Sequence, residues 1–155
     1  MNYYDHIIQL DEVKNDLRLD DCFTEDNDAI ERMIASAFEY ISKRSNHVFK
    51  VEDRTYYKSP INGQIVIYDH PINTTTFADN VFPIRGSGYM KFCNLDSIEL
   101  SVGYSERSQV PADLFEVCLR LVKDMYYNSE EKNLRGLTVT EDVNRLIDQH
   151  KRFMM

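Results

Sequence analysis

The residue types that most often bind metals or act as nucleophiles are few in this chain and widely spaced. They are His6, His47, His70, His150, Cys22, Cys93 and Cys118. No two histidines form a one-turn pair, and no cysteines stand at the two-residue interval of a zinc knuckle or a redox motif. We therefore expect histidines on the surface or in loops and reduced, structural cysteines, and we predict no metal site.

Carboxylates are concentrated near the amino terminus. Residues 1–31 hold ten acidic side chains against two basic ones, a net charge of −8, so residues 32–155 are neutral overall. A calcium loop starting at Asp20 would need an oxygen ligand at its third position and a glycine at its sixth, but Cys22 and Glu25 stand there. The run is either a solvated face or a functional acidic surface. Because DNA affinity depends on basic side chains, sequence-specific DNA binding is not expected.

Motifs for phosphate binding and nucleophilic catalysis are incomplete or absent from the sequence. Gly86-Ser87-Gly88 leads into a strand-like run rather than a helix, and no Lys-Ser or Lys-Thr pair follows it. No serine or cysteine has the setting of a Gly-x-Ser-x-Gly turn. The sequence therefore predicts a protein that is not an enzyme and needs no cofactor.

The helices predicted from the sequence have apolar residues at three-and-four intervals. A short helix spans about 10–19, with Asp11 as its N-cap. The clearest helix runs from about Ile30 to Ser45, and another opens at Pro111 and closes at Tyr127. A final amphipathic stretch lies beyond a polar linker, with Thr140 as its expected cap. This last helix could fold back on its own domain or pack into a partner.

Between these helices, β-branched and aromatic residues alternate with turn-forming residues. The predicted strands are Val48–Val51, Thr55–Lys58, Gln64–Tyr68, Tyr89–Phe92 and Ile98–Val102. The segment 73–84 has the composition of a long loop that becomes ordered only against a neighbour.

These elements predict a mostly α fold with a small β region, of the α+β class. We expect a helical bundle of two long amphipathic helices plus a short amino-terminal helix, with central β-hairpins. The expected organisation is one domain over 1–131 with a β insertion at about 48–104, followed by a carboxy-terminal arm over 132–155. At 155 residues and 43% apolar composition there is material for one ordinary core. No apolar run is long enough for a membrane span and no secretory signal is evident, so we expect a cytoplasmic location for the newly made chain.

Two pairs of motifs, in order, resemble a known family. The run from Ile8 to Asp20 and the helix 28–41 resemble the amino-terminal signature of head–tail connector (adaptor) proteins of tailed bacteriophages. The stretches 98–104 and 110–114, with a strand, a Gly-Tyr turn and a Val-Pro-x-Asp-Leu helix start, resemble the family's second signature. The chain differs from shorter members in its larger central region, 48–92, and its extended tail.

The resemblance implies a structural virion protein of the phage neck, assembled in the host cytoplasm. Its subunits would form a homo-oligomeric ring, commonly twelve-fold in this family, between the portal protein and a tail-side stopper or tail protein. DNA would pass through the channel without sequence-specific binding, and no membrane would be involved. The expected subunit or portal contacts are Phe77, Val81, Phe82, Leu146, Ile147 and Phe153, and the expected channel-facing acidic residues are Asp20, Asp21, Asp26 and Asp28.

Two other functional classes stay open at this point. The first is an acidic host-interaction module that binds a basic protein partner as a monomer or dimer. The second is a metal-dependent hydrolase or nuclease, which would need two or more carboxylates in one cleft; the spacing of the acidic residues gives it no support.

Overall fold

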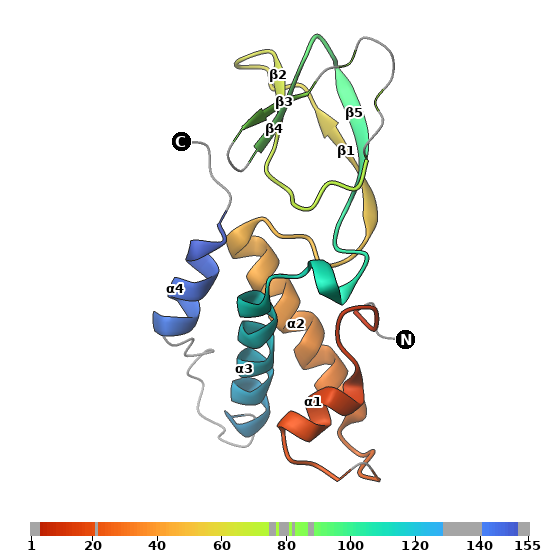
Figure 1. Cartoon of the computed structure of the whole chain (residues 1–155), viewed down its shortest axis with the longest axis vertical. Coiled ribbons are helices and arrows are strands. Elements are labelled where there is room, and N and C mark those ends of the chain that lie inside the picture. The colour runs from red at the N-terminus through yellow and green to blue at the C-terminus, as the bar shows by residue number, and fades with distance from the viewer. Residues whose placement is uncertain are drawn as a thin grey trace.

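The computed structural model describes residues 4–20, 22–74, 77, 81, 83–86, 89–128 and 141–151. Within these ranges the helices gather at one end of the molecule and the strands at the other (Figure 1). This arrangement confirms the predicted α+β class. The elements are α1 (Leu10–Asp16), α2 (Asn27–Ser45), β1 (Glu52–Tyr57), β2 (Gln64–Ile67), β3 (Ile84–Gly86), β4 (Tyr89–Cys93), β5 (Ser97–Val102), a 3-10 turn (Arg107–Gln109), α3 (Ala112–Asn128) and α4 (Glu141–Gln149).

The two longest described helices, α2 and α3, pack against each other through the apolar faces that the sequence predicts. α2 ends at Ser45, and Asn46 adopts the left-handed conformation (φ 60°) that often closes a helix. α3 begins directly after Pro111, which fits the first turn of a helix. None of the helices that the structure describes is both long enough and apolar enough to cross a membrane.

The predicted N-cap of α1 is wrong by two residues. The helix begins at Leu10 with Gln9 as its N-cap, and no side chain caps it. The backbone N–H groups of Glu12 and Val13 donate to the carbonyl of Gln9, so Asp11 already lies inside the first turn. There its carboxylate still stabilises the helix, because it faces the positive end of the helix dipole.

The main core lies between the helices and extends to the connections that lead to the strands. Phe38 of α2 packs against Phe49, with ring centroids 4.7 Å apart, and Phe49 packs against Tyr104 at 5.6 Å. Val143 and Ile147 of α4 are buried in the same core. The final helix therefore folds back on its own chain.

The strands form a ribbon and a small sheet that enclose a second core. β1 and β5 pair in antiparallel register, and a three-stranded sheet has the order β2-β4-β3. The second core lies in this β region and is formed by Val48, Ile65, Ile67, Met90, Phe92, Leu100 and Val102. At one side of the ribbon, Asp69 accepts hydrogen bonds from Tyr56 Oη at 2.5 Å and from Arg54 Nη1 at 2.8 Å.

The prediction of a strand over Val48–Val51 is wrong. This segment is an extended connection between the two parts of the molecule: Val48 N–H donates to the carbonyl of His70 at 2.8 Å, and Val48 C=O accepts from Tyr104 N–H at 3.0 Å. The regular strand begins only at Glu52. The short β3 was not predicted, because it begins at the end of the expected loop 73–84 and its last residue belongs to the glycine-rich run Gly86-Ser87-Gly88.

Candidate interaction surfaces

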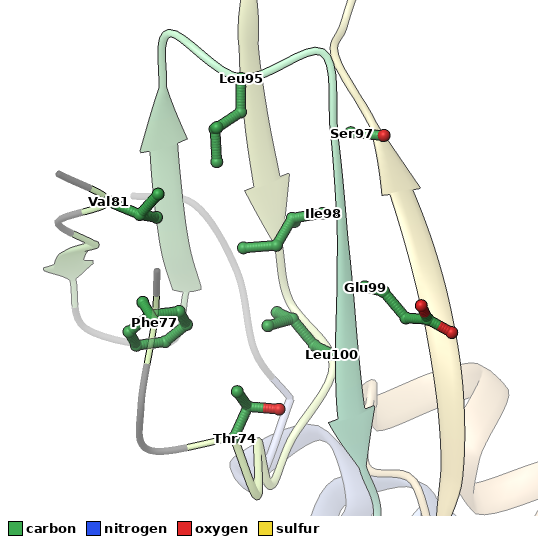
Figure 2. A pocket seen from close by; sticks show the side chains of 8 residues that line it. All are labelled: Thr74, Phe77, Val81, Leu95, Ser97, Ile98, Glu99 and Leu100. Atoms are coloured by element: carbon green, nitrogen blue, oxygen red, sulfur yellow. The ribbon is translucent and has the colours of Figure 1, made fainter. Parts of the chain in front are cut away.

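An apolar pocket of about 320 Å³ opens in the β region. Its walls come from β5, from the turn before β5 and from the segment between β2 and β3 (Figure 2). The lining residues are Thr74, Phe77, Val81, Leu95, Ser97, Ile98, Glu99 and Leu100. We call this cavity the β pocket.

The strand alternation of β5 explains why the β pocket is apolar. Successive side chains of a strand point to opposite faces. Ile98 and Leu100 point toward Phe77 and Val81, whereas Glu99 points away from them (Figure 2). Phe77 also packs on Phe92 with ring centroids 5.4 Å apart. The pocket is therefore an extension of the second core that remains open to solvent.

The start of the opposite wall is fixed by hydrogen bonds to β5. Asn73 N–H donates to the carbonyl of Ser101 at 2.8 Å, and Ser101 N–H donates to Thr74 Oγ1 at 3.0 Å. These bonds hold the chain beside β5 just before Phe77. Of the predicted contact residues, the structure thus brings Phe77 and Val81 together, while Phe82 and Phe153 lie outside the described residues.

The predicted contact residues of the tail lie on α4, which is docked on α2. Ile147 is fully buried in the main core and Leu146 is partly buried against it. Arg44 donates to both carboxylate oxygens of Asp148, at 2.9 and 2.7 Å, and Tyr40 Oη donates to Asn144 Oδ1 at 2.8 Å. The hydrogen bonds from Arg44 lower the pKa of Asp148. While α4 stays docked, Ile147 cannot contact a partner.

Histidines far apart in the sequence meet where the helices join the strands. His47 lies in the connection between α2 and β1, which agrees with the predicted loop position, but it is only 1% exposed and so is not on the surface. Its Nδ1 lies 2.6 Å from Tyr104 Oη and its Nε2 lies 3.0 Å from the carbonyl oxygen of His150. The His70 ring packs edge-on against His47, with centroids 5.3 Å apart. The sequence could not show this convergence, because all of these contacts are long-range.

The histidine cluster is a structural junction. A carbonyl oxygen only accepts, so Nε2 of His47 carries the proton that it donates to His150, and in the neutral ring Nδ1 accepts from Tyr104 Oη. Both ring nitrogens are therefore engaged. Among the described residues, no group of three or more histidine, cysteine, aspartate or glutamate side chains is arranged to hold a metal ion.

The predicted acidic residues lie in and after the connection between α1 and α2, at the end of the molecule opposite the strands (Figure 1). Asp20 and Asp28 are exposed. Asp26 is half-buried and accepts a hydrogen bond from Tyr126 Oη at 2.8 Å, so it attaches this connection to α3. Asp21 lies outside the described residues.

An exposed apolar turn between β1 and β2 was missed by the sequence analysis. Tyr57 and Ile61 are 74% and 94% exposed, at the end of β1 and in the turn that leads to β2. The turn is ordered by hydrogen bonds from Ser59 N–H to Gln64 C=O at 3.0 Å and from Gly63 N–H to Ser59 C=O at 2.9 Å. β1 pairs with β5 and β2 pairs with β4, so this turn joins the ribbon to the small sheet. We call residues 57–63 the hairpin tip for the tight reversal of the chain, although β1 and β2 do not pair with each other. An isoleucine within a turn of polar residues was the available signal.

Comparisons with known proteins give a match in fold alone. No family model and no curated protein matches the sequence. The fold is similar to that of a chain in the neck of an empty gene transfer agent (GTA) particle computed with C6 symmetry, with a TM-score of 0.71 and 14% identity over 96% of this chain and 91% of that chain. A chain from the neck of a native GTA particle computed with C12 symmetry gives a TM-score of 0.64 and 14% identity over 94% and 89%.

Proposed function

We propose that this protein is a structural subunit of a phage-type neck, the adaptor that joins the portal to a tail-side stopper or tail protein. The observation that supports this most is the similarity in fold to chains of GTA necks, which spans nearly the whole of both chains. The connector-like motifs near both ends of the β region also support this proposal. They are independent evidence, because they come from the sequence and not from the comparison of folds.

In the proposed ring each subunit contributes to a channel through which DNA passes. A cyclic ring needs two different complementary surfaces on every subunit, because its contacts are head to tail. The β pocket is one candidate surface, and the arm over 132–155 is another if it leaves its own subunit. Asp20 and Asp28 would face the channel, where carboxylates repel the DNA backbone and let it slide without adhesion.

The mass of the purified protein, alone and mixed with the portal protein of the same phage, tests this proposal. Light scattering behind size exclusion should show a ring-sized species, or a monomer that joins the portal stoichiometrically. A monomer that ignores the portal would overturn the proposal and would favour the acidic host-interaction module.

The channel assignment has its own test. Replacing Asp20 and Asp28 by asparagine should slow DNA packaging and ejection, because the channel wall would lose charges that repel DNA. Asp5 is an exposed acidic residue, and Asp5→Asn serves as a matched control. Unchanged packaging and ejection in the double variant would argue against a channel position.

A further inference from the structure

The hairpin tip combines features that are unusual for a surface turn. Ile61 is almost fully exposed, although turns favour glycine, proline, asparagine, aspartate and serine. Its backbone N–H donates to Ser59 Oγ at 3.4 Å, and the N–H of Gln64 donates to Asn62 Oδ1 at 3.2 Å. The turn therefore presents an apolar side chain on an ordered backbone, which reduces the entropy lost when that side chain becomes buried in a contact.

The β pocket offers what such a side chain needs. It is open, its lining is mainly aliphatic and aromatic, and its volume corresponds to about ten water molecules at liquid density. This space is ample for one isoleucine side chain. Ile61 does not enter the pocket of its own subunit, since 94% of it is exposed. The tip of a second copy is therefore a fitting occupant.

The charges next to the hairpin tip and next to the β pocket are complementary. Lys58 is the only charged residue in the sequence of the tip, and it makes a long ion pair of 3.5 Å with Asp96 of its own chain, whose side chain is 98% exposed. Asp96 stands between Leu95 and Ser97, which line the β pocket. A tip that inserts Ile61 into a neighbouring pocket would bring its positive charge close to the Asp96 of that neighbour.

We propose that the hairpin tip of each subunit inserts Ile61 into the β pocket of the next copy of this chain. This inference rests on the proposed ring, and it names one pair of surfaces that hold the ring together. In the proposed ring the tip of one subunit and the pocket of the next would make a head-to-tail contact, which repeats around the ring. Burial of one isoleucine side chain should strengthen each contact about ten- to a hundredfold.

Disulfide cross-linking in the assembled ring tests this contact between the tip and the pocket directly. In a background with Cys22→Ser and Cys93→Ser, which removes the exposed thiols, Ile61→Cys is combined with Leu95→Cys at the pocket. Mild oxidation should give a ladder of cross-linked subunits on a non-reducing gel. The control combines Ile61→Cys with Tyr127→Cys, which is exposed on α3. A ring that gives no more cross-links than the control would overturn the inference and leave the proposed ring intact.

Substitutions at the tip provide a second test. Ile61→Asp should weaken subunit association at least tenfold with an unchanged melting temperature, because the side chain supports nothing in its own subunit. Ile84→Asp, at another exposed apolar position outside the tip, is the matched control. Normal assembly of Ile61→Asp would overturn the inference, whereas a wild-type protein that stays monomeric even with the portal would overturn the proposed function as well.

Discussion

Replacing Gly103 by alanine should destabilise the protein more than the same change at any ordinary turn. Gly103 has φ +113°, a conformation that side chains rarely adopt. A Cβ atom there would lie 2.7 Å from the carbonyl carbon of Lys50 and 2.9 Å from Val51 Cα, and it would overlap the carbonyl oxygen of Lys50. All of these are backbone atoms, so no change of rotamer relieves the clash.

The expected cost has two parts. Backbone strain of this kind amounts to about 1–3 kcal/mol. The backbone at Gly103, just after β5, must also move away from Lys50. This movement strains the hydrogen bonds from Gly103 N–H to Pro71 C=O at 2.9 Å and from Asn73 Nδ2 to Gly103 C=O at 2.7 Å. Each contributes about 0.5–1.5 kcal/mol. The variant should therefore lose about 2–6 kcal/mol, a large share of the stability of a typical domain.

Gly63→Ala is the matched control for this prediction. Gly63 also has a positive φ of +68°, but a Cβ atom there would meet only Lys58 Cε at 3.7 Å, which is ordinary contact with a flexible side chain. The cost should be about 1–2 kcal/mol, from the left-handed conformation alone. Urea denaturation followed by circular dichroism, with tyrosine fluorescence as a second probe because the chain has no tryptophan, measures both variants. Equal midpoints for the two variants would refute the steric reasoning.

Three further predictions concern groups with shifted pKa values. Burial raises the pKa of the Cys118 thiol, so a thiol reagent should modify only the other two cysteines until the protein unfolds. Arg44 lowers the pKa of Asp148, so the salt bridge between them stabilises the docked α4 fully at pH values above the ordinary aspartate pKa of about 3.9. This stabilisation is lost as the pH falls through the lowered pKa of Asp148 in the folded protein. Hydrogen exchange of α4 in Asp148→Asn should lack this acid dependence. Burial and the hydrogen bond to Asp69 raise the pKa of Tyr56, and Tyr56→Phe should cost about 0.5–1.5 kcal/mol in urea denaturation at neutral pH.

The sequence predicts the helices well because their apolar periodicity is a local property. The interval that marks Ile34 and Phe38 on one face is the interval that buries them. The strands were harder to place. Val48–Val51 has the composition of a strand, yet its backbone hydrogen bonds go to single residues on two other segments, and only the tertiary structure decides that.

The candidate surfaces were predicted only in part. The apolar composition around Phe77 and Val81 indicated a functional segment, and the structure places both in one pocket. The histidine junction was missed, because His47 and His150 meet only through the docking of α4. The exposure of Ile61, which lies between two predicted strands, could not be predicted, since exposure is decided by what packs around a residue and not by its type.

The hydrogen bond from Tyr104 N–H to Val48 C=O holds together the two points at which the chain begins and ends the β region. Segments whose ends lie together can be lengthened, shortened or exchanged during evolution without disturbing the rest of a fold. Here Phe49 and Tyr104 belong to the main core, and the chain that joins them could change while α2, α3 and α4 keep their contacts with one another. A lineage of such proteins can therefore diversify its contacts in this region while it retains a common helical scaffold.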